Sequence, residues 1–165
     1  MPGALIHGHS KDVQVVAYEV DGWGVGEVAL ADSRLLWHEL PGLRRRRPTH
    51  EPHPFTERVR EYFAGARDDF ADVEIDLEWA TPFQRALAET LRGIPYGETV
   101  TYGELAALAG RPGAQRAAGT FCARNRFGLV VPCHRVVAAD GPGSYGSLGV
   151  GYKQRLLALE GHGAL

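Results

Sequence analysis

The sequence predicts an α/β protein in two parts, a small β-rich N-terminal domain with one helix over residues 1–78 and a mainly helical C-terminal domain over residues 79–165. Three observations predict this division. Residues 13–37 alternate loosely between apolar and polar side chains, residues 66–80 form an acidic stretch where the composition changes, and the chain beyond is divided by repeated helix start and stop signals. We therefore place the domain boundary near residue 79.

The N-terminal half should begin with short antiparallel strands, because the alternating segment is rich in Val, Trp and Leu and contains the turn signal Asp21-Gly22. Residues 41–54 hold four prolines and the run Arg44–Arg47, which favours an exposed loop. These arginines either contact a phosphate backbone or are simply solvated. Apolar residues at helical spacing then predict a helix from Phe55 to Phe63 that stops at Gly65.

The C-terminal half contains well-marked helices. One begins at Thr81, a favoured capping residue, has Pro82 in its first turn, and ends at Gly93. A last short helix is expected from Lys153 to Glu160, closed by Gly161. Both helices frame the central part of this half.

Two further helices with a tight joint lie between them. Residues 101–110 begin with the spacing of a capping box and end in glycine, and residues 111–113 form a short Arg-Pro-Gly joint. Residues 114–124 then have helical character with small side chains on one face. This layout is typical of a helix-turn-helix, a motif that also occurs in proteins that do not touch DNA.

The composition excludes several classes of protein. No apolar run approaches the length of a membrane span, the first residues lack the features of a secretory signal, and two cysteines are too few for a disulfide scaffold. We therefore expect a cytoplasmic protein.

The net charge of −2 gives no general attraction to nucleic acid, but residues 111–135 contain five arginines and no acidic residue. That cluster indicates either a local polyanion site or a solvated surface.

The most informative segment is Val131–Val136, in which Cys133 and His134 stand side by side. A thiolate is a strong nucleophile, and a nearby imidazole is the usual means of generating one. Pro132 fixes its own φ and favours an extended residue before it, so we expect a strand end or sharp turn that presents the cysteine in a fixed direction. A buried structural cysteine is the alternative.

The order of motifs in the second half resembles one known family. The residues that carry the resemblance are Thr81-Pro82-Phe83-Gln84-Arg85, Ile94-Pro95-Tyr96-Gly97-Glu98-Thr99, Thr101-Tyr102-Gly103-Glu104-Leu105-Ala106, Arg116-Ala117, Asn125, Pro132-Cys133-His134-Arg135-Val136-Val137, and Lys153 with Leu156-Leu157-Ala158-Leu159-Glu160-Gly161. This pattern is similar to that of the O6-alkylguanine-DNA alkyltransferases. It covers residues 81–161, and the first half matches only in layout, which implies a ribonuclease-H-like N-terminal domain.

The resemblance implies a DNA-repair reaction. The protein would flip an alkylated guanine out of duplex DNA and transfer the alkyl group from O6 to Cys133, once per molecule. His134 would take the thiol proton through a water, Glu160 would orient His134, and Asn125 would brace the turn. Glu160 could instead simply end a helix, and Asn125 could be a C-cap.

The resemblance also implies contacts with the base and the DNA. Tyr102 would donate to N3 of the flipped guanine, which stabilises the negative charge of the leaving group. Arg116 would enter the duplex and fill the space that the base leaves. The helix around it would approach the minor groove, and further contacts are implied near the cysteine and in the glycine-rich loop 141–151: Ala114, Gln115, Ala117, Gly119, Arg135, Val136, Lys153, and Tyr145 or Ser147.

The chain departs from the family pattern at a few positions. Arg126 follows Asn125 where a proline is usual, Gln115 replaces a common alanine, and the loop needs a one-residue gap, so either Tyr145 or Ser147 inherits each loop role. Two rivals from other classes are a lesion-sensing module without chemistry and a thiol hydrolase.

We expect duplex DNA as the partner, a monomer, and no membrane, obligate protein partner, cofactor or metal. The histidines that could suggest a metal lie in loose, proline-rich or terminal segments: His7, His9, His50 and His53.

Overall fold

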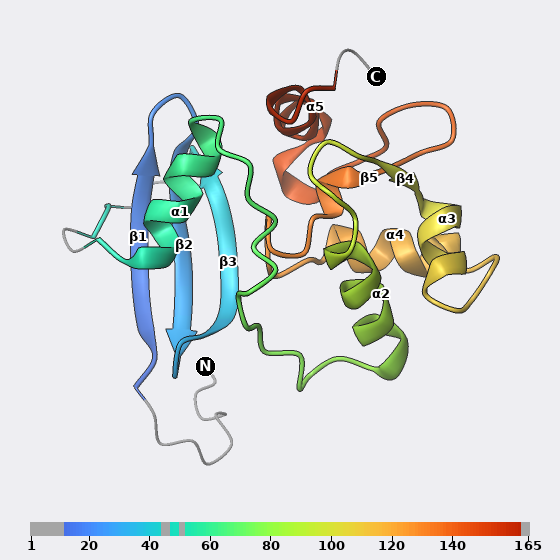
Figure 1. Ribbon diagram of the computed structural model, residues 1–165, viewed down its shortest axis with the longest axis horizontal. Helices are drawn as coiled ribbons and strands as arrows, with labels where there is room; N and C mark the ends of the chain where they lie inside the picture. The colour runs from blue at the N-terminus through green and yellow to red at the C-terminus, as the bar shows by residue number, and fades with distance from the viewer. Residues whose placement is uncertain (1–11, 44–46, 50–51, 163–165) are drawn as a thin grey trace.

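The computed structural model describes residues 12–43, 47–49 and 52–162. It has the predicted mixed α/β fold, with a three-stranded sheet and one helix followed by a mainly helical region. Figure 1 shows the sheet and helix α1 at one end of the molecule and helices α2 to α5 at the other, with strand β3 nearest the helical end.

The sheet is an antiparallel meander of β1 (Gln14–Val20), β2 (Gly24–Ala31) and β3 (Arg34–Gly42), in that order. The predicted strands are therefore confirmed. Strand β3 is longer than expected, because Val25 of β2 pairs with Gly42 beyond a β-bulge and draws the start of the predicted loop into the sheet. Of the arginine run in that loop, Arg44–46 lie outside the described residues and Arg47 is exposed.

Helix α1 (Pro54–Phe63) is the helix predicted for this half. His53 caps it, because the ring Nδ1 accepts a hydrogen bond of 3.0 Å from the Phe55 amide. Its buried face, which includes Phe55 and Val59, joins the apolar face of the sheet in one continuous core. An isolated sheet would leave its apolar face in water, so the helix that covers this face stabilises it.

The free edge of β3 is covered by two distant segments. Leu35 forms a parallel bridge with Ile75 of the acidic stretch, and His38 forms another with Phe127, near the cysteine turn. The acidic stretch is therefore more than a solvated connector: Arg58 of α1 donates to both Asp68 and Asp72. These contacts satisfy an edge that would otherwise expose unpaired amides and carbonyls.

The helical region contains α2 (Pro82–Arg92), α3 (Tyr102–Leu108), α4 (Gln115–Ala123) and α5 (Val150–Leu159), which confirms the four predicted helices. Thr81 and Thr101 form the capping boxes of α2 and α3. Helix α5 begins three residues earlier than expected, directly after Gly149, which has a positive φ of 87°. Helices α3 and α4 pack together as the predicted helix-turn-helix pair.

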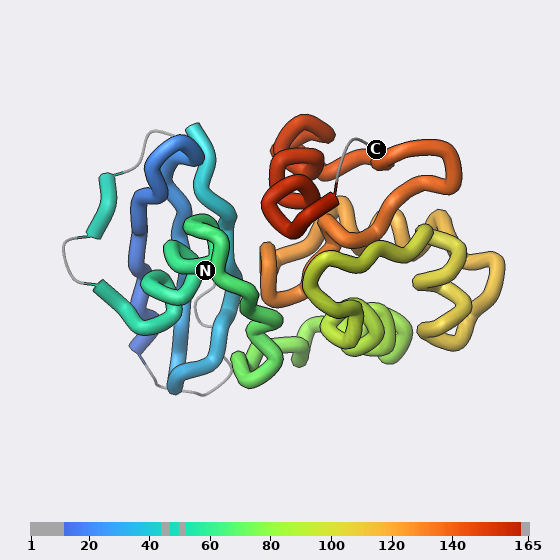
Figure 2. The backbone as a smooth tube through the Cα atoms, turned by 45° about the horizontal axis from the view of Figure 1, so that its top comes forward, coloured from blue at the N-terminus to red at the C-terminus, as the bar shows by residue number. Residues whose placement is uncertain are grey.

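Between α4 and α5 lie the cysteine turn η2 (Cys133–Arg135), the short strand β5 (Val136–Val137) and the one-turn helix η3 (Gly146–Leu148). Strand β5 pairs in parallel with β4 (Val100–Thr101), a pairing that the sequence did not predict. This pairing links the residues just after the cysteine turn to the start of α3. Figure 2 shows the loop after β5 extending to the same end of the molecule as α3 and α4.

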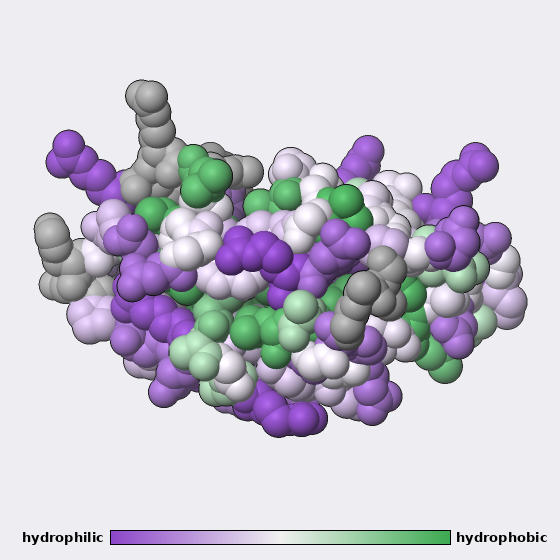
Figure 3. Space-filling view, turned by 90° about the horizontal axis from the view of Figure 1, so that it is seen from above, coloured by the Kyte–Doolittle hydropathy of each residue, from purple (hydrophilic) through white to green (hydrophobic). Residues whose placement is uncertain are grey.

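In the part of the chain that the structure describes, no helix has both the length and the apolar content to cross a bilayer. In Figure 3, the apolar patches on the face seen from above are small and separated by polar side chains.

Candidate active site

Cys133 lies at the start of the η2 turn and is only 1% exposed. Its amide donates to the Val131 carbonyl at 2.8 Å, and the same carbonyl accepts a 2.7 Å hydrogen bond from Nδ2 of Asn125. The other end of the Asn125 amide, Oδ1, accepts from the Phe127 amide at 2.9 Å. Asn125 therefore ties both ends of the segment 125–131 and fixes the backbone that leads to the thiol.

The Cys133 thiol lies in an environment that opposes ionisation. Burial raises its pKa well above the ordinary value, and the neighbouring thiol of Cys122 raises it further. The charge of Lys153 and a hydrogen bond from Asn125 act in the opposite direction and are weaker. The resting group is therefore a thiol, and a reaction at this sulfur requires a base that removes its proton.

His134, the next residue, has the properties of such a base. Its Nε2 is 2.7 Å from Oε2 of Glu160, and because a carboxylate only accepts, Nε2 must carry the proton. Burial lowers the pKa of His134 despite this partner, so the ring is neutral near pH 7. Its Nδ1 is buried and has no hydrogen-bond partner within the described chain, which leaves a lone pair available for a proton.

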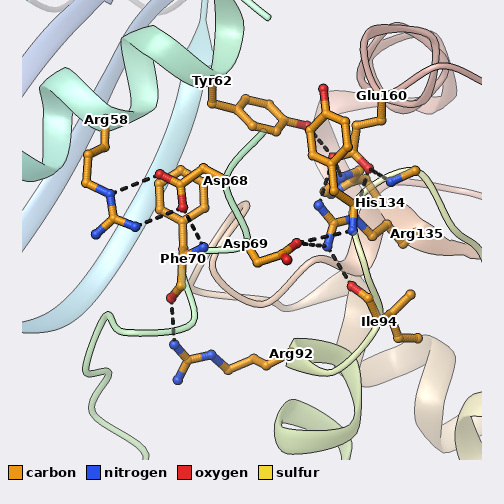
Figure 4. A network of polar contacts seen from close by, with 12 residues as sticks. Arg58, Tyr62, Asp68, Asp69, Phe70, Arg92, Ile94, His134, Arg135 and Glu160 are labelled. Carbon is orange, nitrogen blue, oxygen red and sulfur yellow. Dashed lines mark hydrogen bonds and ion pairs between the residues drawn. The ribbon is translucent and has the colours of Figure 1, made fainter. Parts of the chain in front are cut away.

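Glu160 is the C-cap residue of α5, and its side chain is completely buried. Besides His134, it accepts from the Tyr62 hydroxyl at 2.5 Å, from the Gly97 amide at 3.0 Å, and from Nε and Nη2 of Arg135 at 2.9 and 3.0 Å. Figure 4 shows these side chains converging on one carboxylate. Burial raises the pKa of Glu160, but hydrogen bonds from His134 and Arg135 hold it well below its ordinary value.

Arg135 and Val136 were expected to contact DNA or the base, and the structure buries both side chains. The guanidinium of Arg135 is bidentate on Glu160, donates to the Ile94 carbonyl at 2.8 Å, and lies 3.7 Å from Asp69. Its donors therefore face the interior, where they neutralise the Glu160 carboxylate. In this structure neither side chain reaches the surface, and Arg135 acts inside the fold.

A hollow of about 730 Å³ opens beside the helix-turn-helix. Tyr102 at the start of α3 lines it together with Arg116, Gln115 and Gly119 of α4, so four residues that were predicted separately lie around one space. Arg116 and Gln115 are exposed. Two more predicted residues lie nearby: Ala117 on α4 is exposed, and Ala114, the N-cap of α4, is half-buried.

Tyr102 and Lys153 meet at the inner side of this hollow. Nζ of Lys153 donates to the Ser144 carbonyl at 3.0 Å and to the Tyr102 hydroxyl at 3.4 Å. Burial lowers the pKa of Lys153 to about 8, although the two thiols, Cys122 and Cys133, counteract part of this shift. Burial raises the pKa of Tyr102, so its hydroxyl remains a hydrogen-bond donor near neutral pH.

The glycine-rich loop supplies residues to both sides of the site. Ser144 lines the 730 Å³ hollow, whereas Tyr145 and Ser147 line a larger groove of about 1010 Å³ between β3 and the α4–α5 region. Tyr145 is partly buried and packs its ring against Tyr152, with centroids 6.2 Å apart, and Ser147 is exposed. The Tyr102 hydroxyl donates to the Ser144 carbonyl at 3.4 Å, a partner that the sequence did not predict.

Sequence reasoning also missed several partners of Glu160. Tyr62 comes from α1, far away in the chain, and no local pattern marks it. Gly97 belongs to a quoted motif, and its position is specific: φ is +85°, and a Cβ there would lie 3.2 Å from the Glu160 carbonyl. Only glycine fits this backbone without strain, so its amide can reach the carboxylate.

The described residues contain no group of three or more His, Cys, Asp or Glu side chains that could hold a metal ion. His53 caps α1, and the other three histidines that were considered, His7, His9 and His50, lie outside the described part of the chain.

The chain is similar in sequence to known proteins. The family model for the 6-O-methylguanine DNA methyltransferase DNA binding domain matches residues 82–162. The methylated-DNA–protein-cysteine methyltransferase of Mycolicibacterium paratuberculosis is 47% identical over 116 residues, which cover 68% of this chain and 68% of that protein.

The similarity to solved structures covers more of the chain. The Mycobacterium tuberculosis O6-methylguanine methyltransferase matches with a TM-score of 0.73 and 35% identity, over 89% of this chain and 93% of that chain. The structure of Mycobacterium tuberculosis OGT in complex with DNA matches with a TM-score of 0.73 and 37% identity, over 88% of this chain and 91% of that chain.

The fold and the site together define a mixed α/β protein with a helix-turn-helix pair and a buried cysteine next to a histidine and a carboxylate. More particularly, the chain belongs to the 6-O-methylguanine DNA methyltransferase family.

Proposed function

We propose that this protein repairs O6-alkylguanine in duplex DNA, mainly O6-methylguanine, by moving the alkyl group to Cys133 in a single irreversible step. One observation carries the proposal. The buried thiol is followed by a neutral His134 whose Nε2 is fixed by Glu160 and whose Nδ1 has no partner within the described chain. A nucleophile, a base and a group that orients the base are the parts that such a transfer needs.

The reaction balances with the groups present. Sγ of Cys133 attacks the alkyl carbon as its proton passes to Nδ1 of His134, directly or through one water. The bond between that carbon and O6 breaks, and its electron pair stays on the base. The base takes up a proton from water at N1 to become guanine, and the proton on His134 returns to water. The product is a thioether, which no group in the site can reverse, so each molecule acts once.

Stabilisation of the departing base is assigned to Tyr102. Its hydroxyl stays protonated, and a donor at N3 gains strength as negative charge develops on the ring. Lys153 holds the Tyr102 hydroxyl and the Ser144 carbonyl in place and lowers the pKa of the Cys133 thiol. It therefore favours the thiolate at the moment of attack.

We propose that duplex DNA binds the exposed face of α4. Arg116 would enter the DNA duplex and occupy the space that the flipped base leaves. This insertion would offset part of the few kcal/mol that unstacking the base costs. The small residues beside it, Ala117 and Gly119, allow the backbone to approach the minor groove, where little base-specific reading is possible. We further infer that the protein is cytoplasmic, since both of its cysteines are free thiols. We also infer that it is a monomer with two domains that meet near residue 79.

The direct test is to mix the protein with a duplex that contains one O6-methylguanine and to measure intact mass, followed by peptide mapping. We expect one added methyl group on Cys133 and unmodified guanine in the DNA. Cys133→Ser should bind the duplex without transfer, and Cys122→Ser is the matched control that should still transfer. Tight lesion binding by the wild-type protein with no mass change would instead identify a lesion sensor, and repeated turnover on a thioester would identify a hydrolase.

A further inference from the structure

We propose that His38, in the sheet of the N-terminal half, is a positioning residue for the alkyl transfer. It holds the loop 126–128 and, through that loop, the Asn125 brace behind Cys133. This inference rests on the proposed function, because it assigns His38 a part in the same reaction. His38 lies on β3, the strand that Figure 1 shows nearest the helical half.

His38 makes three hydrogen bonds to the loop. Its amide donates to the Arg126 carbonyl at 2.7 Å, its carbonyl accepts from the Gly128 amide at 3.3 Å, and Nδ1 of the ring donates to the Gly128 carbonyl at 2.7 Å. The first two are backbone hydrogen bonds that extend the sheet edge, and almost any residue at position 38 could form them. The third depends on the histidine side chain and fixes the loop against the sheet.

The ring itself is held firmly. Because the Gly128 carbonyl can only accept, Nδ1 carries the proton, and Nε2 accepts from the Tyr18 hydroxyl at 2.5 Å. The ring is 3% exposed and meets Phe55 edge to face, with centroids 5.0 Å apart. Burial lowers the pKa of His38 to about 4, so one neutral tautomer persists near pH 7. A neutral ring with both nitrogens bonded has no free lone pair to accept a proton, which suits it to positioning.

The loop connects this ring to the thiol in a few contacts. Phe127, between the two residues bonded to His38, donates its amide to Asn125 Oδ1. Asn125 in turn donates to the Val131 carbonyl, which also receives the Cys133 amide. The loop packs closely against the sheet at Gly128, where a Cβ would lie 2.5 Å from Cγ of Leu40. Displacement of the loop would therefore move the Asn125 brace.

The test compares two polar variants that differ in where they place an amide nitrogen. In His38→Asn the nitrogen takes the place of Nδ1 and can still donate to Gly128, whereas in His38→Gln it takes the place of Nε2. Tyr18→Phe is the matched control, because it removes only the bond to Nε2. For each protein we would measure the single-turnover rate of methyl transfer and the Kd for lesion DNA, at a temperature well below the lowest unfolding midpoint.

We expect His38→Gln to transfer about tenfold more slowly, since a small displacement of reacting groups costs one to two orders of magnitude. His38→Asn and Tyr18→Phe should stay within about threefold of the wild-type rate, and Kd should change by less than about twofold in every variant. The proposal is overturned if His38→Gln keeps the wild-type rate, if His38→Asn is no faster than His38→Gln, or if Kd weakens in step with the rate. A wild-type protein that transfers no methyl group would instead overturn the proposed function.

Discussion

Two buried histidines, His134 beside the cysteine and His38 in the sheet, differ in one respect that separates their roles. Burial lowers the pKa of both, so both are neutral near pH 7. At His38 both ring nitrogens have partners, Tyr18 and Gly128. At His134 one nitrogen is fixed by Glu160 and the other has no partner among the described residues.

This difference shows that burial alone does not indicate chemistry. A histidine ring whose two nitrogens both have partners has no free lone pair to accept a proton. Its removal would loosen the groups that it holds in place. A ring with one firm partner and one open nitrogen is both oriented and basic, which is what a general base requires. Unpaired polar atoms are rare in protein interiors, so the open Nδ1 of His134 is the informative one.

The strongest test of this contrast is His134→Gln. The amide nitrogen of glutamine can still donate to Glu160, so the network should stay folded, but the base is lost. We expect the single-turnover rate of methyl transfer to fall by about 10²–10⁴, the usual contribution of general-base catalysis. The comparable change in the sheet, His38→Gln, should cost much less. A His134→Gln rate within about tenfold of the wild type would remove His134 from the role of base.

A second test addresses the carboxylate that orients His134. Glu160→Gln keeps the shape but removes the charge that balances buried Arg135. We expect a loss of about 3–5 kcal/mol in the free energy of unfolding, measured by urea denaturation, because an uncompensated buried charge remains. Glu57→Gln is the matched control: its ion pair with Arg60 lies at the surface and should contribute no more than about 1 kcal/mol. Equal losses in the two variants would contradict a special role for the buried network.

The third test uses acid. The pKa of His38 falls from 6.5 in the unfolded chain to about 4 in the folded protein, so the unfolded state binds more protons between these values. The contribution of His38 to the free energy of unfolding is therefore fully present above pH 6.5. It declines by about 3 kcal/mol as the pH falls towards 4. The unfolding free energy of His38→Asn should lack this contribution and decline less steeply. Parallel curves for the two proteins would show that His38 does not titrate in this way.

Much of the fold was predictable because its signals are local. Thr81 and Thr101 predict the starts of their helices, because a capping box involves residues within four positions of each other. The turn at Asp21-Gly22 predicts the first hairpin. The helix-turn-helix follows from two such helices and a short joint. The β4–β5 pairing has no local signal, because each strand is only two residues long and its partner lies far along the chain.

The site was predictable only in part. The motif around Cys133 predicted that Cys133 and His134 lie together at a turn, and a family resemblance was needed to connect Glu160 with them. The inward position of Arg135 was not foreseen, because an arginine near a basic surface is typical of DNA contact and only packing shows that its donors are occupied. His38 gave no signal at all, since a histidine in an alternating strand has no local feature that predicts its partners.

The contacts that complete the site also affect the order in which a folding chain acquires its abilities. His38 and Gly128 are 90 positions apart, and Tyr62 and Glu160 are 98 positions apart. Contacts over such separations form slowly, because the intervening chain must lose its conformational freedom first. The helices of the second half have local signals and can form early, before either contact exists. A newly made chain can therefore form the helices of its second half, and the His134–Glu160 contact within it, before His38 and Tyr62 add the support of the first half to the Asn125 brace and to Glu160.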